Sequence, residues 1–142
     1  MGLDSTGRAH WEGDLTGGSG TTTLDSGAAG PMQVSWKARS EAHDGLTSPE
    51  ELIAAAHAAC YCMAFSGRLG KAGGSNIVID AVATATFVPG EGITAMTLTV
   101  RGSAGGVGEE EFLSLAEDAK ENCPVSQALA GNVPITLDAA VA

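Results

Sequence analysis

The sequence predicts a mixed α+β fold, and three observations support this prediction. Several segments alternate apolar and polar residues, which is the pattern of strands with one buried face. A long uncharged segment follows Ser48-Pro49-Glu50-Glu51, which is a strong helix start. Glycine and proline pairs separate these segments as turns. Because the chain has 142 residues and no repeat or linker, we expect a single domain over residues 1–142.

The first part of the chain is expected to form strands at 8–15, 21–24 and 32–39. The first contains Trp11 and runs toward a Gly-Gly turn, and the second is rich in threonine. In 32–39, apolar residues occupy every second position, and Pro31 precedes the segment as a strand-entry residue.

The central helix is expected to run from about 49 to 69. Ser48 can cap it, Pro49 suits its first position, and Gly70 marks its end. No formal charge occurs between Leu52 and Phe65. A helix that is apolar all round is buried on every side, so we expect another surface to cover it.

The rest of the chain predicts a hairpin, two helices and a last strand. Strands at 77–87 and 93–101 flank Pro89-Gly90-Glu91-Gly92, and 102–108 reads as a loop. The next helix begins at three glutamates and is interrupted before Pro124, which starts a short helix. A strand is expected at 133–141.

Composition excludes several classes of function. With 17 acidic and 7 basic residues the net charge is −10, which argues against binding nucleic acid or an anionic membrane surface. We see no apolar run long enough to span a membrane and no signal peptide, and we expect a cytoplasmic protein.

The chain has 24 alanines but only 28 Leu, Ile, Val and Phe residues. We therefore expect stability to come partly from burial against a second copy.

The three cysteines are the main candidates for chemistry. Cys60 lies in the middle of the apolar helix and Cys123 lies at the cap before Pro124, where a helix N-terminus favours the thiolate. Each could also be a structural residue, a core thiol at Cys60 and a cap at Cys123. Cys62 is turned about 200° from Cys60 on a helix, so we interpret it as core packing.

His57 shares the face of Cys60, because it precedes that residue by three positions. It is either a base or, in our preferred interpretation, a hydrogen-bonded core histidine. A zinc site built from His57 and the three cysteines is an alternative, but the opposed faces of Cys60 and Cys62 argue against it. We expect no metal and no cofactor.

Two segments resemble the signature segments of the OsmC/Ohr family. One runs from Thr47 to Cys60 (TSPEELIAAAHAAC) and the other from Cys123 to Leu129 (CPVSQAL). The opening GRAHWEGD and the closing ITLD are similar to the OsmC branch. The resemblance covers essentially the whole chain. It implies a thiol-dependent hydroperoxide reductase, built as an intertwined homodimer whose two central helices are wrapped by antiparallel β-sheets.

The same resemblance implies the roles of four residues. Cys60 would be the peroxidatic thiol, Cys123 the resolving thiol, Arg39 the cation that activates Cys60, and Glu50 the carboxylate that holds Arg39. Arg8 and Arg101 are the alternatives to Arg39. Glu50 precedes Cys60 by ten positions, about 15 Å along one helix, so the two would meet only across two antiparallel helices of a dimer.

The sequence therefore predicts a peroxidase that reduces organic hydroperoxides more readily than hydrogen peroxide. Its Cys60 sulfenic acid would condense with Cys123, and a dithiol reductant, such as a lipoyl group, would reduce the disulfide. Two alternatives remain: a non-catalytic protein that binds a hydrophobic ligand, and a redox sensor. Turnover with a reductant present separates the enzyme from both.

Overall fold

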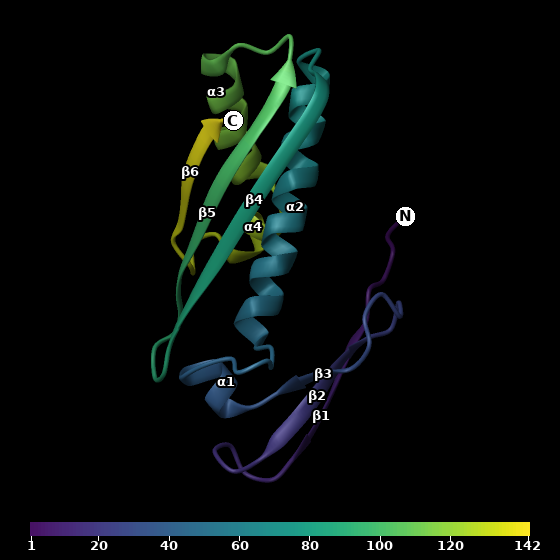
Figure 1. Cartoon of the computed structure of the whole chain (residues 1–142), viewed down its shortest axis with the longest axis vertical. Coiled ribbons are helices and arrows are strands. Elements are labelled where there is room, and N and C mark those ends of the chain that lie inside the picture. The colour runs from purple at the N-terminus through teal and green to yellow at the C-terminus, as the bar shows by residue number, and fades with distance from the viewer. The chain divides into compact units, whose positions relative to one another are not determined.

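The computed structural model describes every residue from Met1 to Ala142. It has two compact units, Met1–Leu52 and Ile53–Ala142, each with one three-stranded sheet. The four helices and six strands confirm the predicted α+β class. We describe each unit by itself (Figure 1).

The first unit contains an antiparallel sheet in the order β1 (Gly7–Glu12), β2 (Ser19–Leu24), β3 (Met32–Val34). The predicted strand over 32–39 is wrong beyond Val34, where a short helix, α1 (Trp36–Ser40), begins. The cause is Ser35, whose hydroxyl accepts a hydrogen bond from the backbone N–H of Ala38 at 3.1 Å. This N-cap fixes a helical turn that outweighs the two-residue alternation.

Helix α2 (Pro49–Lys71) confirms the predicted central helix. The Ser48 hydroxyl accepts the N–H of Glu51 at 3.1 Å, as expected of a capping residue. In a capping box, the Glu51 carboxylate would in turn accept from the backbone N–H of Ser48. Here it accepts from the Thr47 hydroxyl at 3.0 Å, so only the Ser48 half of the capping box forms. After the helix, Gly73 takes a positive φ of 84°, a conformation that favours glycine, and the chain turns into the next strand.

The second unit contains a sheet in the order β4 (Ser75–Val88), β5 (Gly92–Gly105), β6 (Ile135–Val141). The β4–β5 hairpin is antiparallel and longer than predicted, because β5 takes in the first residues of the expected loop. β6 pairs with β5 in parallel, which differs from the expected antiparallel sheets. The chain between them contains α3 (Glu109–Asn122) and α4 (Pro124–Leu129), and such a crossover returns a strand in the same direction.

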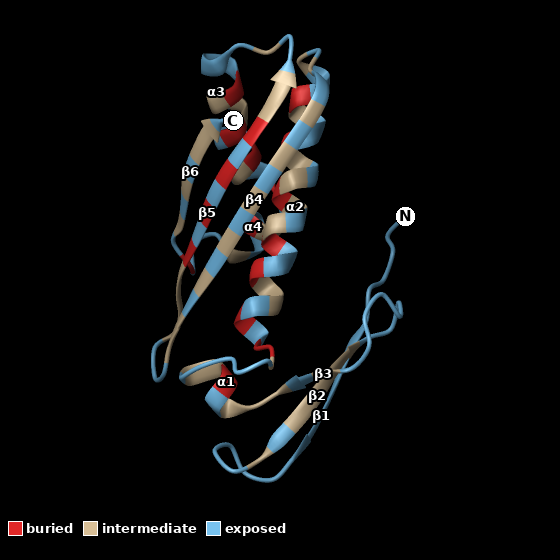
Figure 2. Ribbon diagram, in the orientation of Figure 1, coloured by how far each residue is buried: buried red, intermediate tan, exposed pale blue.

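The larger of two hydrophobic clusters joins the helices to this sheet. It contains Tyr61, Phe65 and Leu69 of α2, Leu98 and Val100 of β5, and Phe112, Ala116 and Ala119 of α3. Figure 1 shows α2, α3 and α4 on the same side of the sheet. In Figure 2 the buried positions form a stripe along one side of α2. Within this chain the helix is therefore buried on one face only, and the expectation that another surface covers the rest stays a prediction.

The opposite face of α2 is uncharged and exposed. Its members are Ala55, Ala56, Ala59, Met63, Ser66, Gly67 and Gly70, which we call the α2 stripe. Met63 is the largest of them, with a relative exposure of 74%. The positions 56, 59, 63, 66 and 70 alternate steps of three and four, which is the spacing of the seam between two packed helices.

Helix α2 is also long and apolar enough, by length and composition alone, to cross a membrane. This corrects the expectation that no segment of the chain is. Its fully buried side chains, among them Tyr61 and Phe65, pack against the sheet and α3 in a shared core. One face of α2 therefore belongs to the core of the second unit.

Candidate active site

Cys60 and Cys123 lie together in the second unit. Cys60 is half-buried on α2, while Cys123 is fully buried at the junction between α3 and α4. Cys60 packs against the core cluster that contains Cys123, and the pKa of its thiol responds to Cys123 and to the backbone N–H of Val125, so both groups lie beside its sulfur. The structure thus brings the two predicted thiols into contact.

The position of Cys123 follows from the break between the two helices. Its backbone N–H donates to the Ala119 carbonyl at 2.9 Å and closes α3, and its extended backbone makes it the N-cap of α4. Pro124 forces this break, because the residue before a proline leaves the helical conformation. The Cys123 side chain makes no capping hydrogen bond. Its sulfur therefore does not serve as a cap.

The surroundings of Cys60 within the second unit hold it as a thiol. Burial raises the pKa of Cys60, and the hydrogen bond and charge of Cys123 raise it further. The Val125 N–H acts in the opposite direction, because it stabilises the thiolate. No cationic side chain contributes to this shift. A cation must therefore be brought to Cys60 if the thiolate is to form readily at neutral pH.

Cys62 lies apart from this pair. Burial and the nearby Asp80 raise the pKa of Cys62, while the backbone N–H of Ala81 on β4 acts in the opposite direction. Cys60 therefore contacts α4 while Cys62 contacts β4, which confirms that they occupy different faces of α2. No group of three or more His, Cys, Asp or Glu side chains lies close enough together to hold a metal ion.

His57 is a hydrogen-bonded core histidine, as preferred from the sequence. Its Nε2 lies 2.8 Å from the hydroxyl oxygen of Ser126 on α4, and both residues are buried. Its Nδ1 is buried and has no hydrogen-bond partner. Burial lowers the pKa of His57, so the imidazole is neutral at neutral pH.

Arg39 and Glu50 form an ion pair within the first unit. Arg39 Nε donates to Glu50 Oε1 at 2.9 Å, and Nη2 lies 2.8 Å from the same oxygen. The Glu50 side chain has a relative exposure of 6%, against 35% for Arg39. A buried carboxylate thus holds a guanidinium that still reaches solvent.

The two alternative arginines form exposed ion pairs instead. Arg8 pairs with Asp25 at 2.7 Å, and Arg101 pairs with Asp138 at 3.0 Å. Neither arginine pairs with a buried carboxylate. Of the three candidates, Arg39 alone pairs with Glu50, the carboxylate that the resemblance implies, and the structure shows that this carboxylate is buried.

The sequence did not identify two groups that contact the site residues. They are the backbone N–H of Val125, which contacts Cys60, and the hydroxyl of Ser126, which contacts His57. The signal available was Pro124, because a helix that begins there leaves the N–H groups of its first turn unpaired. The sequence carried no sign that this turn would lie on α2.

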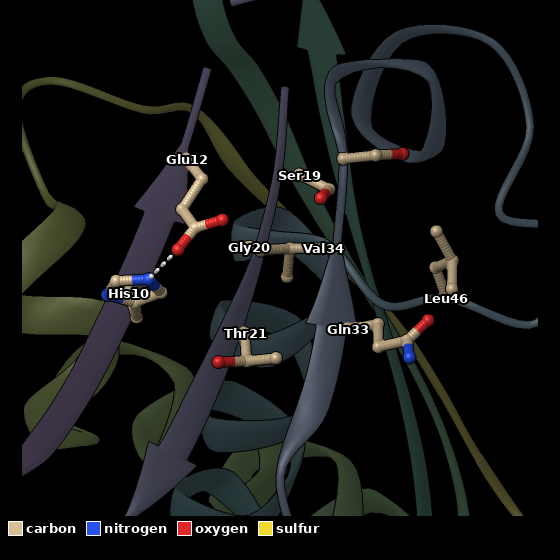
Figure 3. Close-up of a pocket in the computed structure, with 9 residues that line it drawn as sticks. His10, Glu12, Ser19, Gly20, Thr21, Gln33, Val34 and Leu46 are labelled. Carbon is tan, nitrogen blue, oxygen red and sulfur yellow. Dashed lines mark hydrogen bonds and ion pairs between the residues drawn. The ribbon is translucent and has the colours of Figure 1, made fainter. Parts of the chain in front are cut away.

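A separate hollow lies on the sheet of the first unit (Figure 3). It has a volume of about 320 Å³ and is lined by residues of β1, β2 and β3 together with Ser35 and Leu46. His10 and Glu12 form a hydrogen bond at its rim, 3.1 Å long. It contains no cysteine, so we do not assign it to the thiol chemistry.

The fold and the thiol pair define a class of two-cysteine α+β proteins. Residues 42–138 match the family described as OsmC-like protein. The chain is 40% identical over 141 residues to the Peroxiredoxin OsmC of Escherichia coli (strain K12), covering 97% of this chain and 96% of that protein. The Peroxiredoxin OsmC of Shigella flexneri matches equally well. The chain belongs to the OsmC-like family, and the similarity supports the OsmC branch.

Solved structures agree with this assignment. An organic hydroperoxide resistance protein from Elizabethkingia anophelis matches with a TM-score of 0.71 and 25% identity, covering 100% of both chains. An organic hydroperoxide resistance protein OsmC from Legionella pneumophila matches the fold with a TM-score of 0.70 and 22% identity, covering 97% of both chains. The predicted family and its fold are therefore confirmed.

Proposed function

We propose that this chain is a thiol-dependent peroxidase that reduces organic hydroperoxides, with Cys60 as the attacking thiol and Cys123 as the resolving thiol. The observation that carries the proposal is the contact between a half-exposed thiol on α2 and a buried thiol at the start of α4. The names of the relatives, a peroxiredoxin and an organic hydroperoxide resistance protein, support the same reaction.

The reaction takes place in three steps. The Cys60 thiolate attacks one oxygen of the hydroperoxide, the O–O bond breaks, and the departing alkoxide takes a proton to leave as alcohol. Cys60 is then a sulfenic acid, and the Cys123 sulfur attacks it, forms the disulfide and releases water. A dithiol reductant, such as a lipoyl group, restores both thiols by two exchange reactions.

Arg39 is the cation that we assign to the activation of Cys60. A guanidinium beside the sulfur would favour the thiolate and offset the charge on the departing oxygen. Glu50 keeps the guanidinium pointed in one direction through the 2.8 Å and 2.9 Å contacts. Arg8 and Arg101 lack a buried partner of this kind, which favours Arg39 over both.

A homodimer with shared sites explains how Arg39 and Glu50 serve Cys60. Glu50 and Cys60 are about 15 Å apart along α2, so one helix cannot bring them together. The α2 stripe is uncharged, has small side chains apart from Met63 and has the spacing of a helix–helix seam. Two antiparallel copies of α2 that cross at Ala55, at the N-terminal end of this stripe, would place Glu50 of one chain near Cys60 of the other, because positions 50 and 60 are equally far from position 55.

The remaining assignments follow from composition and burial. Cys60 packs against the apolar core, which favours organic hydroperoxides over hydrogen peroxide. The net charge of −10 makes nucleic acid and an anionic membrane poor partners. We propose that the chain acts as one domain in the cytoplasm and needs no cofactor.

The test is consumption of cumene hydroperoxide and of hydrogen peroxide with dithiothreitol or a lipoyl dithiol. We expect turnover of both, faster with cumene hydroperoxide, and no turnover by Cys60→Ser. Cys62→Ser is the matched control, because it changes a thiol on the same helix that contacts β4, and it should keep full activity. Stoichiometric oxidation without turnover would indicate a redox sensor, and no reaction at all would favour a ligand-binding protein.

A further inference from the structure

A buried imidazole next to the thiol pair has no part in the reaction proposed above. His57 is fully buried, its Nε2 lies 2.8 Å from the Ser126 hydroxyl, and its Nδ1 has no partner. Ser126 is also buried, with a relative exposure of 3%. This pair is a polar contact placed inside the apolar core.

Such a contact is costly to keep. A neutral imidazole has one nitrogen that donates and one that accepts, so Nδ1 stays unpaired whichever part Nε2 plays toward Ser126. A leucine at position 57 would fill similar space without an unpaired nitrogen. Natural sequences depart from such local consistency mainly at functional sites. The polar pair is therefore a candidate for a functional role.

The location of the pair suggests that role. His57 lies three positions before Cys60 on α2, and Ser126 lies three positions after Cys123 in the first turn of α4. The imidazole–hydroxyl contact and the thiol–thiol contact therefore join the same two helices, about one turn apart. Both the Cys123 sulfur and the Val125 N–H reach Cys60 from this first turn of α4.

We propose that His57 is a positioning residue, which holds the first turn of α4 on α2 through Ser126 and thereby keeps Cys123 in reach of Cys60. This inference rests on the proposed function, and it names the contact that supports the resolving step. His57 does not act as the base for Cys60 in this structure. Its Nε2 is engaged by Ser126, and it is absent from the groups that influence the Cys60 sulfur.

The physical consequence is a high effective concentration of one thiol at the other. When α4 is fixed, little rotational and translational freedom is lost as the disulfide forms. Without the His57–Ser126 hydrogen bond, the first turn of α4 would populate more positions. The equilibrium constant for disulfide formation would then fall with the fraction of time that Cys123 spends within reach of Cys60.

The experiment measures that effective concentration without any peroxide. The full chain is equilibrated with oxidised and reduced glutathione, in which two protein thiols and one glutathione disulfide exchange to one protein disulfide and two glutathiones. Alkylation and mass spectrometry then give the fraction with Cys60 joined to Cys123. We expect Ser126→Ala and His57→Leu each to lower the equilibrium constant roughly threefold to tenfold, the size of one buried hydrogen bond.

The two substitutions are also expected to be non-additive, because either one removes the same contact. The double variant should lower the constant no further than the more severe single variant. His57→Gln offers a nitrogen to Ser126 at a similar reach, and it should recover most of the loss.

Tyr61→Phe is the matched control. Tyr61 donates a buried hydrogen bond at 3.0 Å from α2 to the Ala116 carbonyl on α3, so its loss weakens the contact between α2 and α3 and leaves the His57–Ser126 hydrogen bond in place. We expect its equilibrium constant to equal that of the wild type. Equal losses in Tyr61→Phe and Ser126→Ala would overturn the proposal, as would an unchanged constant in Ser126→Ala and His57→Leu.

Failure of the proposed function would look different. A wild-type chain that forms the Cys60–Cys123 disulfide in glutathione but turns over no hydroperoxide would refute the peroxidase and leave the positioning role standing. If His57→Leu does not fold, Ser126→Ala and the His57→Gln comparison decide the question, since Ser126→Ala removes a single oxygen atom.

Discussion

Arg39 approaches only one oxygen of Glu50: its Nε and Nη2 lie 2.9 Å and 2.8 Å from Oε1, while Oε2 is buried with no partner. A carboxylate held this way aims the guanidinium through a charge-assisted contact. The loss of this charge should be felt at the thiol that Arg39 is proposed to activate.

Glu50→Gln should therefore slow the reaction of the reduced protein with cumene hydroperoxide. A hydrogen bond to a charged group contributes enough to predict a roughly tenfold to hundredfold lower rate constant. Stopped-flow consumption of the hydroperoxide measures it. Arg101→Gln is the control, because it breaks an exposed ion pair with Asp138 and should change the rate little. Equal rates in the wild type and Glu50→Gln would remove Glu50 from the site.

Cys123→Ser should complete one turnover and then become over-oxidised. Its Cys60 sulfenic acid has no resolving thiol, so a second hydroperoxide converts it to the sulfinic acid. Intact-mass measurement should show a gain of about 32 Da, for two oxygen atoms. Sustained turnover by this variant with a dithiol would contradict the role of Cys123, and peptide mapping that joins Cys60 to Cys62 would do the same.

Two inactive variants should restore activity when they are refolded together. In a heterodimer of Glu50→Ala and Cys60→Ser, one of the two shared sites draws both residues from unmutated copies. Random pairing gives about half of the dimers this composition. Activity of the mixture is compared with that of each variant refolded alone. A mixture no more active than its parts, or a protein that sediments as a monomer, would rule out the shared site.

The stability of the protein should fall in mild acid because of His57. Burial lowers the pKa of His57 from its ordinary 6.5, so the unfolded chain binds a proton that the folded chain does not. The stabilisation that comes from keeping His57 neutral is complete above about pH 6.5. As the pH falls below this value, the free energy of unfolding decreases by up to about 1.4 kcal/mol per pH unit. Urea unfolding at pH 7.5 and pH 5 measures the loss.

His57→Leu should reduce this pH dependence, whereas His43→Gln, which changes an exposed histidine, should not. A wild type and His57→Leu with the same loss between the two pH values would show that other groups cause it.

Local signals explain what the sequence predicted well. Ser48 and Pro49 start α2 through hydrogen bonds and backbone preferences that involve only neighbouring residues. Pro124 breaks the helix at Cys123 for the same kind of reason. The pairing of Cys60 with Cys123 came from the resemblance, since no spacing rule joins residues so far apart in the chain.

The sequence did not predict features that depend on how distant segments of the chain pack together. The parallel direction of β6 follows from the crossover through α3 and α4, which no pattern within the strand records. The contacts of Val125 and Ser126 require α4 to lie on α2. The misread segment at Trp36–Ser40 is different, because its cap, Ser35, is local and was outweighed by the alternation of apolar residues.

In the homodimer that we propose, the exposed α2 stripe would make folding and assembly a single problem for this chain. A newly made copy would present an uncharged helix face to water until it met another copy, so its unfolding midpoint should rise with the logarithm of protein concentration. Dilution would then weaken the fold and the catalytic sites together, and subunit exchange would be as slow as the opening of that seam.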